Sequence, residues 1–476
     1  MPPPYLSAIS LRNFRGFKAT DDVELAPLTF LVGPNSSGKS SVSDAMMLIS
    51  QSNIVPDFYE ANFEPVWMGE LIDLGSFEDS VFFHNLNLEI SIGFQLKMDP
   101  RSYYSRRLSF DNKAVKYEFK IRWSKLNNLS YVSQVIISDV TTGENLKIKI
   151  RPTSTWSFII EINKNIVHSF DFPRHAPPDY LDTVYRRILP VVSGIIKKPG
   201  VLSHGKGAAW GRILQSLERY GANGFVGRIG RVSSGRSAPH RWYVPKSGIK
   251  DRLFSPFLSR EVYDSLSPEM VDEALEDQQD KARRRPGRRS RNRQKISSLN
   301  KVLDELGIGN KIATTKYTPY HSILEIRDNV LGVNANVADV GYGASQVIPV
   351  IAACLSGEDS PLIVEQPEVH LHPKAQGVIG DLLCDTSRQR QVIVETHSPH
   401  LINRARIRVA SGQIPASDVC VLYVSRSEKG AVITRIPIEP NGDFGAEWPK
   451  GFFDERYEDT MRLLELKRNV SKSSKR

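Results

Sequence analysis

The feature that most constrains this chain is a glycine-rich stretch near its amino terminus, GPNSSGKS, which spans residues 33–40. It matches the G-x-x-x-x-G-K-[ST] pattern, in which backbone N–H groups surround the phosphates of a nucleotide. An apolar run over residues 28–32 predicts a buried strand before it, and apolar residues at helical spacing over 41–49 predict a helix after it. Strand, loop and helix in this order predict a nucleoside triphosphate site.

Each residue type in the loop suits a part of such a ligand. We expect Lys39 to reach the β- and γ-phosphates and the Ser40 hydroxyl to bind Mg²⁺. The cofactors predicted from this loop are therefore ATP and Mg²⁺. The other residues expected to line the ATP site are Asn35, Ser36, Ser37, Gly38 and Ser41.

Length and composition predict several globular units. The chain has 476 residues, more than one hydrophobic core organises, and its 40% hydrophobic and 24% charged residues are ordinary for a globular protein. No apolar run is long enough to span a bilayer, the start MPPP lacks the layout of a signal peptide, and the three cysteines have no metal-ligand spacing. We therefore expect a cytoplasmic protein that makes no membrane contact.

The net charge of +10 is concentrated in one segment. Ten Lys or Arg and no acidic residue lie between Lys281 and Lys301, directly after the acidic stretch from Glu269 to Asp280. Two interpretations stay open. The basic run contacts DNA or RNA phosphates with salt-sensitive affinity, or it is a solvated, flexible loop that the acidic block neutralises.

The middle of the chain divides into two kinds of sequence. Residues 86–172 contain repeated alternation of apolar and polar side chains, as in Ile90, Ile92 and Phe94, which predicts antiparallel strands with one wet face. Residues 173–330 show helical spacing at 180–196 and 210–220 and a Gly/Ser/Pro-rich stretch at 230–245. We expect a mostly helical insertion here, with residues 230–245 as a loop.

Several motifs carry a family resemblance. Residues 9–41, ISLRNFRGFKATDDVELAPLTFLVGPNSSGKSS, resemble the opening of the ATPase heads of the ABC superfamily in its RecF, SMC and OLD branch. GYGASQ at 341–346 resembles a divergent ABC signature, and VHLHP at 369–373 is similar to OLD-type ATPases. The resemblance implies an α/β fold of the ABC head type, with a mixed sheet around the phosphate loop, an antiparallel β subdomain and a long central α/β insertion.

The resemblance also implies roles for individual residues. Arg12, Arg15 and Lys18 are expected near the nucleotide, although surface charge on an edge strand is an equally open interpretation of these residues. Gly343 and Ser345 of the signature are expected to contact the γ-phosphate bound by a second subunit, so two nucleotides would lie within a head-to-tail dimer. His397, after a strand at 391–395, matches the switch histidine that contacts the γ-phosphate.

Residues 361–368, PLIVEQPE, form an apolar strand that ends in acids, the Walker B arrangement. We expect Glu365 to hold Mg²⁺ through water. In most ABC ATPases the next residue is a glutamate that activates the attacking water, whereas this chain has Gln366. An amide is no base at neutral pH, so we expect slow hydrolysis unless Glu368 takes the role.

The motifs imply a division of the chain and a biological role. Because no acidic set typical of a nuclease follows residue 401, we expect an ATPase that controls a separate nuclease or effector through an ATP-bridged homodimer or a higher oligomer of dimers. Similar stand-alone ATPases occur in anti-phage systems such as Septu and PARIS; the alternative is a RecF-like DNA-binding ATPase of repair or recombination. The expected units are 1–85 (lobe with Walker A), 86–172 (β subdomain), 173–330 (insertion), 331–440 (lobe with signature, Walker B and switch histidine) and 441–476 (extension and basic tail).

Overall fold

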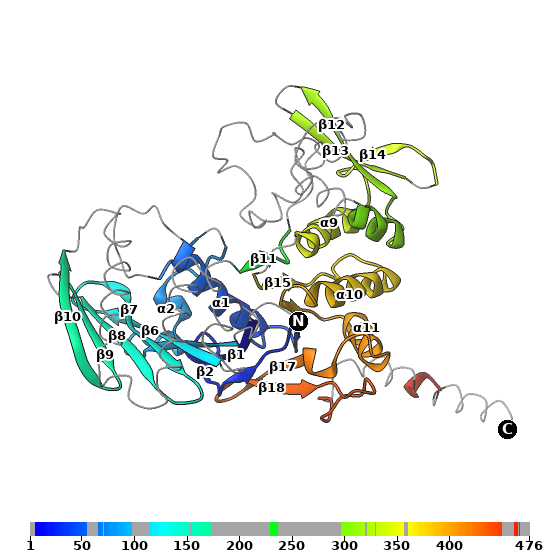
Figure 1. The fold of residues 1–476 in the computed structure, drawn as a ribbon. Coiled ribbons are helices and arrows are strands. Elements are labelled where there is room, and N and C mark those ends of the chain that lie inside the picture. The colour runs from blue at the N-terminus through cyan, green and yellow to red at the C-terminus, as the bar shows by residue number, and fades with distance from the viewer. Residues whose placement is uncertain are drawn as a thin grey trace, which may run out of the picture.

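The computed structural model describes residues 5–54, 65–69, 71–97, 114–152, 155–173, 229–236, 297–318, 321–328, 330–356, 360–449, 461–464 and 466. Figure 1 shows them as layers: a broad antiparallel sheet, the helix α1 (Lys39–Ile54), a second sheet, and a group of helices beyond it.

The phosphate loop follows an inner strand of the second sheet, which has six strands among the described residues. The strand order is β11-β15-β16-β4-β17-β18, and all neighbours run parallel except β18, which is antiparallel to β17. The strand β4 therefore pairs on both sides with strands from the carboxyl-terminal part of the chain. The bounds are β4 (Leu28–Val32), β11 (Gly230–Val232), β15 (Leu362–Glu365), β16 (Val392–Glu395), β17 (Val419–Ser427) and β18 (Gly430–Pro437).

Alternate residues of this parallel sheet enter two separate cores. Leu31, Ile363 and Ile393 pack with α1 and the antiparallel sheet, whereas Phe30 and Val364 pack with the helices on the opposite face. Because both faces are covered, the strands β4, β15 and β16 are buried along their whole length. The helices on the opposite face are α9 (Tyr342–Leu355), α10 (Pro373–Ser387) and α11 (Pro399–Ala410).

The antiparallel sheet has nine strands within the described ranges, in the order β10-β9-β8-β7-β6-β5-β1-β2, with β3 paired to β1. The antiparallel meander predicted over residues 86–172 is confirmed, and the basic, aromatic segment after β5 lies outside the described residues. The bounds are β1 (Tyr5–Phe14), β2 (Phe17–Ala19), β3 (Val23–Glu24), β5 (Ile90–Lys97), β6 (Ala114–Ser124), β7 (Leu129–Asp139), β8 (Asn145–Pro152), β9 (Thr155–Ile162) and β10 (Asn165–Pro173); the short helix α2 (Phe77–Ser80) precedes β5.

The described parts of the central insertion contain more strand than predicted. Residues 297–305 are helical and bury Leu299 and Leu303 in the core that also contains α9. They precede a three-stranded sheet of β12 (Lys311–Thr318), β13 (His321–Arg327) and β14 (Asn334–Asn336). The helices expected at 180–196 and 210–220, and the basic run up to residue 296, lie outside the described residues.

The prediction that residues 230–245 form a loop is wrong at its start. Gly230–Val232 is strand β11, which pairs in parallel with β15. A strand of three residues has no room for a periodic pattern, and this one is stabilised by a partner more than 100 residues away in the chain. The residues of this stretch beyond Arg236 are outside the described part.

Side-chain hydrogen bonds join the two ends of the chain at the base of the parallel sheet. Gln391 accepts from the Leu6 N–H at 2.9 Å and donates to the carbonyl oxygens of Leu6 and Ala26 at 2.8 and 3.1 Å. The mixed α/β fold predicted from the sequence is confirmed. Within the described residues, no helix has the length and apolar character needed to span a membrane.

Candidate nucleotide site

The candidate site lies where β4, β16 and β15 end. Glu395 is in register with Leu31 of β4 on one side and with Glu365 of β15 on the other. Ligands of open α/β sheets bind at the carboxyl ends of the strands, and here these ends carry the phosphate loop and two glutamates. The predicted residues from distant parts of the sequence are thus neighbours on three adjacent strands.

The phosphate loop has a backbone that its glycines permit. Gly33 has φ 144°, and a Cβ there would lie 2.1 Å from the Val424 carbonyl oxygen, so no other residue fits this position. Lys39 is 4% exposed, and its Nζ donates to the carbonyl oxygens of Gly33 and Pro34 at 3.0 and 2.8 Å. Burial lowers the pKa of Lys39, an effect that Glu395 opposes. An ammonium has three donors, so Lys39 can still bind a phosphate.

The other loop residues divide by exposure. Asn35, Ser36 and Ser40 are exposed at the surface of the loop, Gly38 is half-buried, and Ser37 and Ser41 are buried. Hydroxyls or N–H groups of the exposed residues are open to a ligand. The Ser37 hydroxyl is buried without a hydrogen-bond partner.

Ser40 meets a carboxylate that the sequence analysis did not assign to the site. Its hydroxyl donates to Oε1 of Glu395 at 3.0 Å. Glu395 is 5% exposed, and its Oε2 is buried without a hydrogen-bond partner. The signal was present in the sequence, because Glu395 ends an apolar strand in the same way as Glu365.

Glu365 is held by β11 and the residues after it, a stretch predicted to be a loop. Its Oε1 accepts from Arg231 Nε at 2.7 Å, and its Oε2 accepts from the Ser234 N–H and hydroxyl at 3.1 and 3.4 Å. Arg231 also donates to the Leu71 carbonyl oxygen at 2.7 Å. The insertion therefore contacts the Walker B carboxylate directly through β11 and the residues after it.

The residues after β15 form a tight polar turn. Gln366 has φ 43°, its N–H donates to the Glu395 carbonyl oxygen at 2.7 Å, and its own carbonyl oxygen accepts from Arg236 at 2.7 Å. Glu368 Oε1 accepts from the His397 N–H at 2.7 Å, and burial raises the pKa of Glu368. Burial and the charge of Lys39 lower the pKa of His397, which favours the neutral imidazole.

Of the early basic residues, Arg15 rather than Arg12 reaches the helix that follows the phosphate loop. Arg12 is exposed on β1. Arg15 forms an ion pair with Asp44 of α1, and Arg231 approaches the same carboxylate at 3.9 Å. Arg12 is thus at the surface, but the edge-strand part of that interpretation is wrong, because β1 pairs with β2 on one side of Arg12 and with β5 on the other. Asp44 links α1 to Arg15 and Arg231.

The signature segment starts the helix α9. Gly343 packs so tightly against the turn after β15 that a Cβ would lie 2.3 Å from the His370 carbonyl oxygen. Ser345 is 6% exposed, and its hydroxyl donates to the Tyr342 carbonyl oxygen at 2.7 Å. Tyr342 is 51% exposed and packs edge-on against the His370 ring at 4.9 Å. Gly341 and Tyr342 are therefore the exposed residues at this helix start, whereas the Ser345 side chain faces inward.

The described residues include no group of three or more His, Cys, Asp or Glu side chains arranged to hold a metal ion. His372 instead caps α10, accepting from the Lys374 N–H at 3.3 Å. Mg²⁺ in nucleotide sites needs no such cage, since one or two carboxylates and the phosphates of the substrate supply its ligands. The Ser40 hydroxyl and the unpartnered Glu395 oxygen fit a magnesium ion of this kind.

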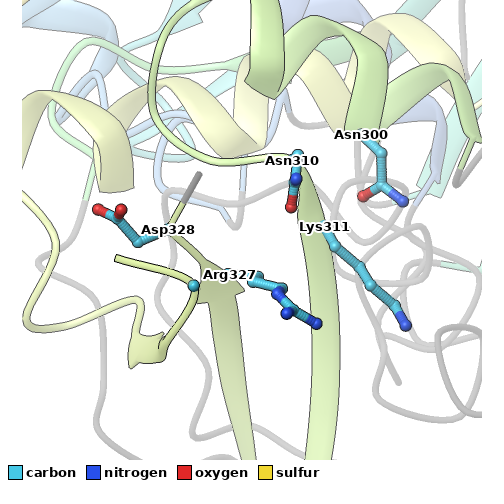
Figure 2. Close-up of a pocket in the computed structure, with 6 residues that line it drawn as sticks. Asn300, Asn310, Lys311, Arg327 and Asp328 are labelled. Atoms are coloured by element: carbon cyan, nitrogen blue, oxygen red, sulfur yellow. The ribbon is translucent and has the colours of Figure 1, made fainter. Parts of the chain in front are cut away.

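A surface depression of about 440 Å³ lies away from these residues, beside the three-stranded sheet. Figure 2 shows Lys311 and Arg327 extending from neighbouring strands, where they are paired in register. Asn300 and Asp328 are occupied by the N–H groups of Ile312 and of residues 330–331, respectively. The lining contains two cations and one carboxylate, whereas the phosphate loop and the strand-end glutamates lie elsewhere, so we place the chemistry at the phosphate loop.

Two buried carboxyls are expected to make the nucleotide-free protein less stable as the pH rises. Burial, with a smaller effect of Glu365, raises the pKa of Glu395 to about 7, and burial raises that of Asp44 to about 6. Their contribution to stability is complete below the unfolded-state pKa and is lost as the pH rises through the folded-state pKa. We expect Glu395→Gln to unfold a few degrees above wild type at pH 8 but not at pH 4 in magnesium-free buffer. Equal melting temperatures at pH 8 would contradict this.

Family models match both ends of the chain. A family described as an AAA ATPase domain matches residues 5–176, and one described as an AAA domain, putative AbiEii toxin, type IV TA system, matches residues 233–403. A family described as a protein of unknown function (DUF3696) matches residues 414–463.

Similarity to individual proteins is more distant. An OLD nuclease from Thermus scotoductus is 30% identical over 121 residues, which are 24% of this chain and 23% of that protein. The match therefore spans about a quarter of that relative. Among solved structures, an Smc head bound to the C-winged helix domain of ScpA has a TM-score of 0.47 at 11% identity, covering 91% of this chain and 98% of the other. An Smc head domain with an extended coiled coil, bound to the C-terminal domain of ScpA derived from Pyrococcus furiosus, has a TM-score of 0.45 at 12% identity. That match covers 98% of this chain and 100% of the other.

Together, the family models support an ATPase of the AAA type, and the curated relative adds a similarity to an OLD nuclease over about a quarter of the chain. Such domains support ATPase activity and imply ATP binding, usually with Mg²⁺. The matched segments contain the phosphate loop in one case and Glu365, Glu395 and His397 in the other.

Proposed function

We propose that this protein binds MgATP at the carboxyl edge of its parallel sheet, closes on a second copy, and thereby controls a separate effector. The observation that carries the proposal is the meeting of Lys39 and Ser40 from one end of the chain with Glu395 and His397 from the other. These residues supply a cation for the phosphates, a hydroxyl and carboxylate for the metal, and a neutral imidazole beside the lysine.

The chain's own groups would divide the work as follows. The phosphate loop and Lys39 would bind and orient the triphosphate, while Ser40 would hold Mg²⁺ directly and Glu365 would meet it through water; the ion would shield the phosphate charge. The backbone N–H of His397 donates to Glu368, which holds the turn after β16, and the charge of Lys39 acts on the imidazole. Its neutral form can donate one hydrogen bond to a phosphate oxygen and lose that contact after hydrolysis.

Gln366→Glu is expected to raise the ATP turnover rate about tenfold or more, since a positioned general base contributes roughly 10²–10⁴-fold. The backbone of Gln366 is held by Glu395 and Arg236, so a side chain of the same shape fits without moving the turn. The measurement is steady-state phosphate release at saturating ATP. Gln389→Glu, which adds the same charge at an exposed position, is the control. An unchanged rate would show that Glu368 or another group already acts.

Two copies are proposed to enclose the nucleotide, with the start of α9 from one copy facing the phosphates of the other. Tyr342→Glu is expected to prevent the dimer that a non-hydrolysable ATP analogue induces in wild type. A glutamate in the first turn favours the helix but repels phosphate, and Tyr342 is half-exposed, so the fold tolerates the change. Sedimentation velocity reports the dimer. Nucleotide affinity of the monomer should stay within about threefold, because the effect acts across the interface. A dimer of unchanged strength would contradict the proposal.

The effector is proposed to be a toxic protein of the nuclease class, in a defence system against phage. What supports this is that one matched family is described as a toxin of a type IV toxin–antitoxin system and that the curated relative is an OLD nuclease. Expression with the neighbouring genes of the source genome, with phage plating as the readout, tests it. Protection that is lost in Lys39→Ala would support the role. Salt-sensitive DNA binding by the isolated protein, without any protection, would favour a RecF-like function instead.

A further inference from the structure

Two glutamates end neighbouring strands at the nucleotide site, but they have different surroundings. Glu395 and Glu365 are partners in the parallel ladder, and each is about 95% buried. Both side chains lie on the face of the sheet that carries α1 and the phosphate loop, because they follow the alternation set by Ile393 and Ile363. Only one of them touches the serine expected to bind magnesium.

Glu365 is fully engaged by the insertion. Arg231 contacts Oε1 through two nitrogens, at 2.7 Å from Nε and 2.6 Å from NH2, and Ser234 supplies two donors to Oε2. An ion pair with both oxygens occupied satisfies a buried carboxylate without a metal ion. Direct metal binding by Glu365 would require Arg231 or Ser234 to leave.

Glu395 is only partly satisfied. Oε1 accepts from Ser40, while Oε2 is buried and has no hydrogen-bond partner. A buried carboxylate oxygen without a donor is costly, and it costs less if a cation occupies the space beside it. The nearest ammonium, on Lys39, donates to backbone carbonyl oxygens of the loop. The Ser40 hydroxyl and Glu395 Oε2 are both oxygen ligands suited to a hard divalent cation.

We propose that Glu395, rather than the Walker B residue Glu365, is the carboxylate that directly binds the magnesium ion of the nucleotide, beside Ser40. Glu365 then holds β11 and its arginine against the site and meets the metal through water. This inference rests on the proposed ATP-binding function and assigns the metal within it. The end of β16 and the turn after it therefore contribute two functional groups, Glu395 to the metal and His397 to the phosphates.

The test compares nucleotide affinity with and without magnesium in the full chain. Binding of a fluorescent non-hydrolysable ATP analogue is titrated in EDTA and in Mg²⁺ for wild type, Glu395→Gln, Glu365→Gln and the exposed control Glu305→Gln. In wild type, Mg²⁺ should strengthen binding. Glu395→Gln should keep the EDTA affinity within about threefold and reduce the gain from Mg²⁺ by about 10–100-fold, the range typical of residues that support a metal. Glu365→Gln should reduce the gain much less.

A second readout follows the metal itself. Electron paramagnetic resonance measures the association constant of Mn²⁺ in the presence of the nucleotide. This constant should be smaller in Glu395→Gln than in Glu365→Gln. An unchanged magnesium gain in Glu395→Gln, or a loss confined to Glu365→Gln, overturns the assignment. If Glu395→Gln fails to bind the nucleotide in EDTA as well, Glu395→Asp replaces it as the test. The assignment then requires that Glu395→Asp bind the nucleotide in EDTA and gain less affinity from Mg²⁺ than wild type. Wild type that binds no nucleotide in either buffer refutes the proposed function instead.

Discussion

Lys39→Ala is expected to lower ATP affinity by at least about a hundredfold, because removing one partner of a buried, hydrogen-bonded charge pair costs roughly 2–5 kcal/mol. Lys39 is buried, and its ammonium is bonded to the carbonyl oxygens of Gly33 and Pro34 within the loop that would surround the phosphates. Two effects therefore add: the phosphates lose their cation, and the loop loses the hydrogen bonds that Lys39 makes to its backbone. Isothermal titration calorimetry with a non-hydrolysable ATP analogue measures the change.

Matched variants separate these two effects. Lys39→Arg keeps the positive charge and should retain more affinity than Lys39→Ala, although its planar head does not reproduce both loop contacts. Lys125→Ala removes a lysine from the exposed turn between β6 and β7 and should leave binding unchanged. Wild-type affinity in Lys39→Ala would show that the loop is not a nucleotide site.

Arg390→Ala is expected to destabilise the protein by about 3–5 kcal/mol. The substitution removes the hydrogen bonds that the charged guanidinium makes, and it leaves a cavity. Arg390 is 1% exposed and donates to Ser360 O, Ser356 Oγ and the Ala353 and Pro361 carbonyl oxygens. It thereby joins the end of α9 to the start of β15, and its charge faces a helix carboxyl terminus. The melting temperature of purified protein, or the soluble yield, reports the loss.

Arg388→Ala provides the comparison two residues away. Arg388 is exposed and donates to the Gln413 carbonyl oxygen, so its removal should cost about 1 kcal/mol or less. If both variants melt at the same temperature, Arg390 does not join α9 to the parallel sheet as its contacts indicate.

Much of the fold could be predicted because the relevant patterns are local. The strand, loop and helix around Lys39 are continuous in the sequence, and the strands over 86–172 show their alternation directly. The strands that end in Glu365 and Glu395 are short apolar runs with polar ends, and they occur as predicted. That these distant segments belong to one ATPase head was expected from the family resemblance, because no local pattern contains it.

What could not be predicted depends on pairing between distant segments. The strand β11 has three residues and is defined by its partner β15, so Arg231 gave no sign that it would bind Glu365. The contact between Ser40 and Glu395 likewise joins residues 355 positions apart. The Ser345 hydroxyl bonds to the Tyr342 carbonyl oxygen within its own helix turn, and Gly343 packs on the turn at His370, neither of which a motif reveals.

The central claim is that both ends of the chain build one MgATP site. Its most direct test is an experimental structure of the protein with Mg²⁺ and a non-hydrolysable ATP analogue. We expect the phosphates on the loop at residues 33–40, with Ser40 and Glu395 on the metal and His397 beside the γ-phosphate. A nucleotide bound at the depression formed by Lys311 and Arg327, or one that contacts the phosphate loop with Glu395 and His397 turned away, would contradict it.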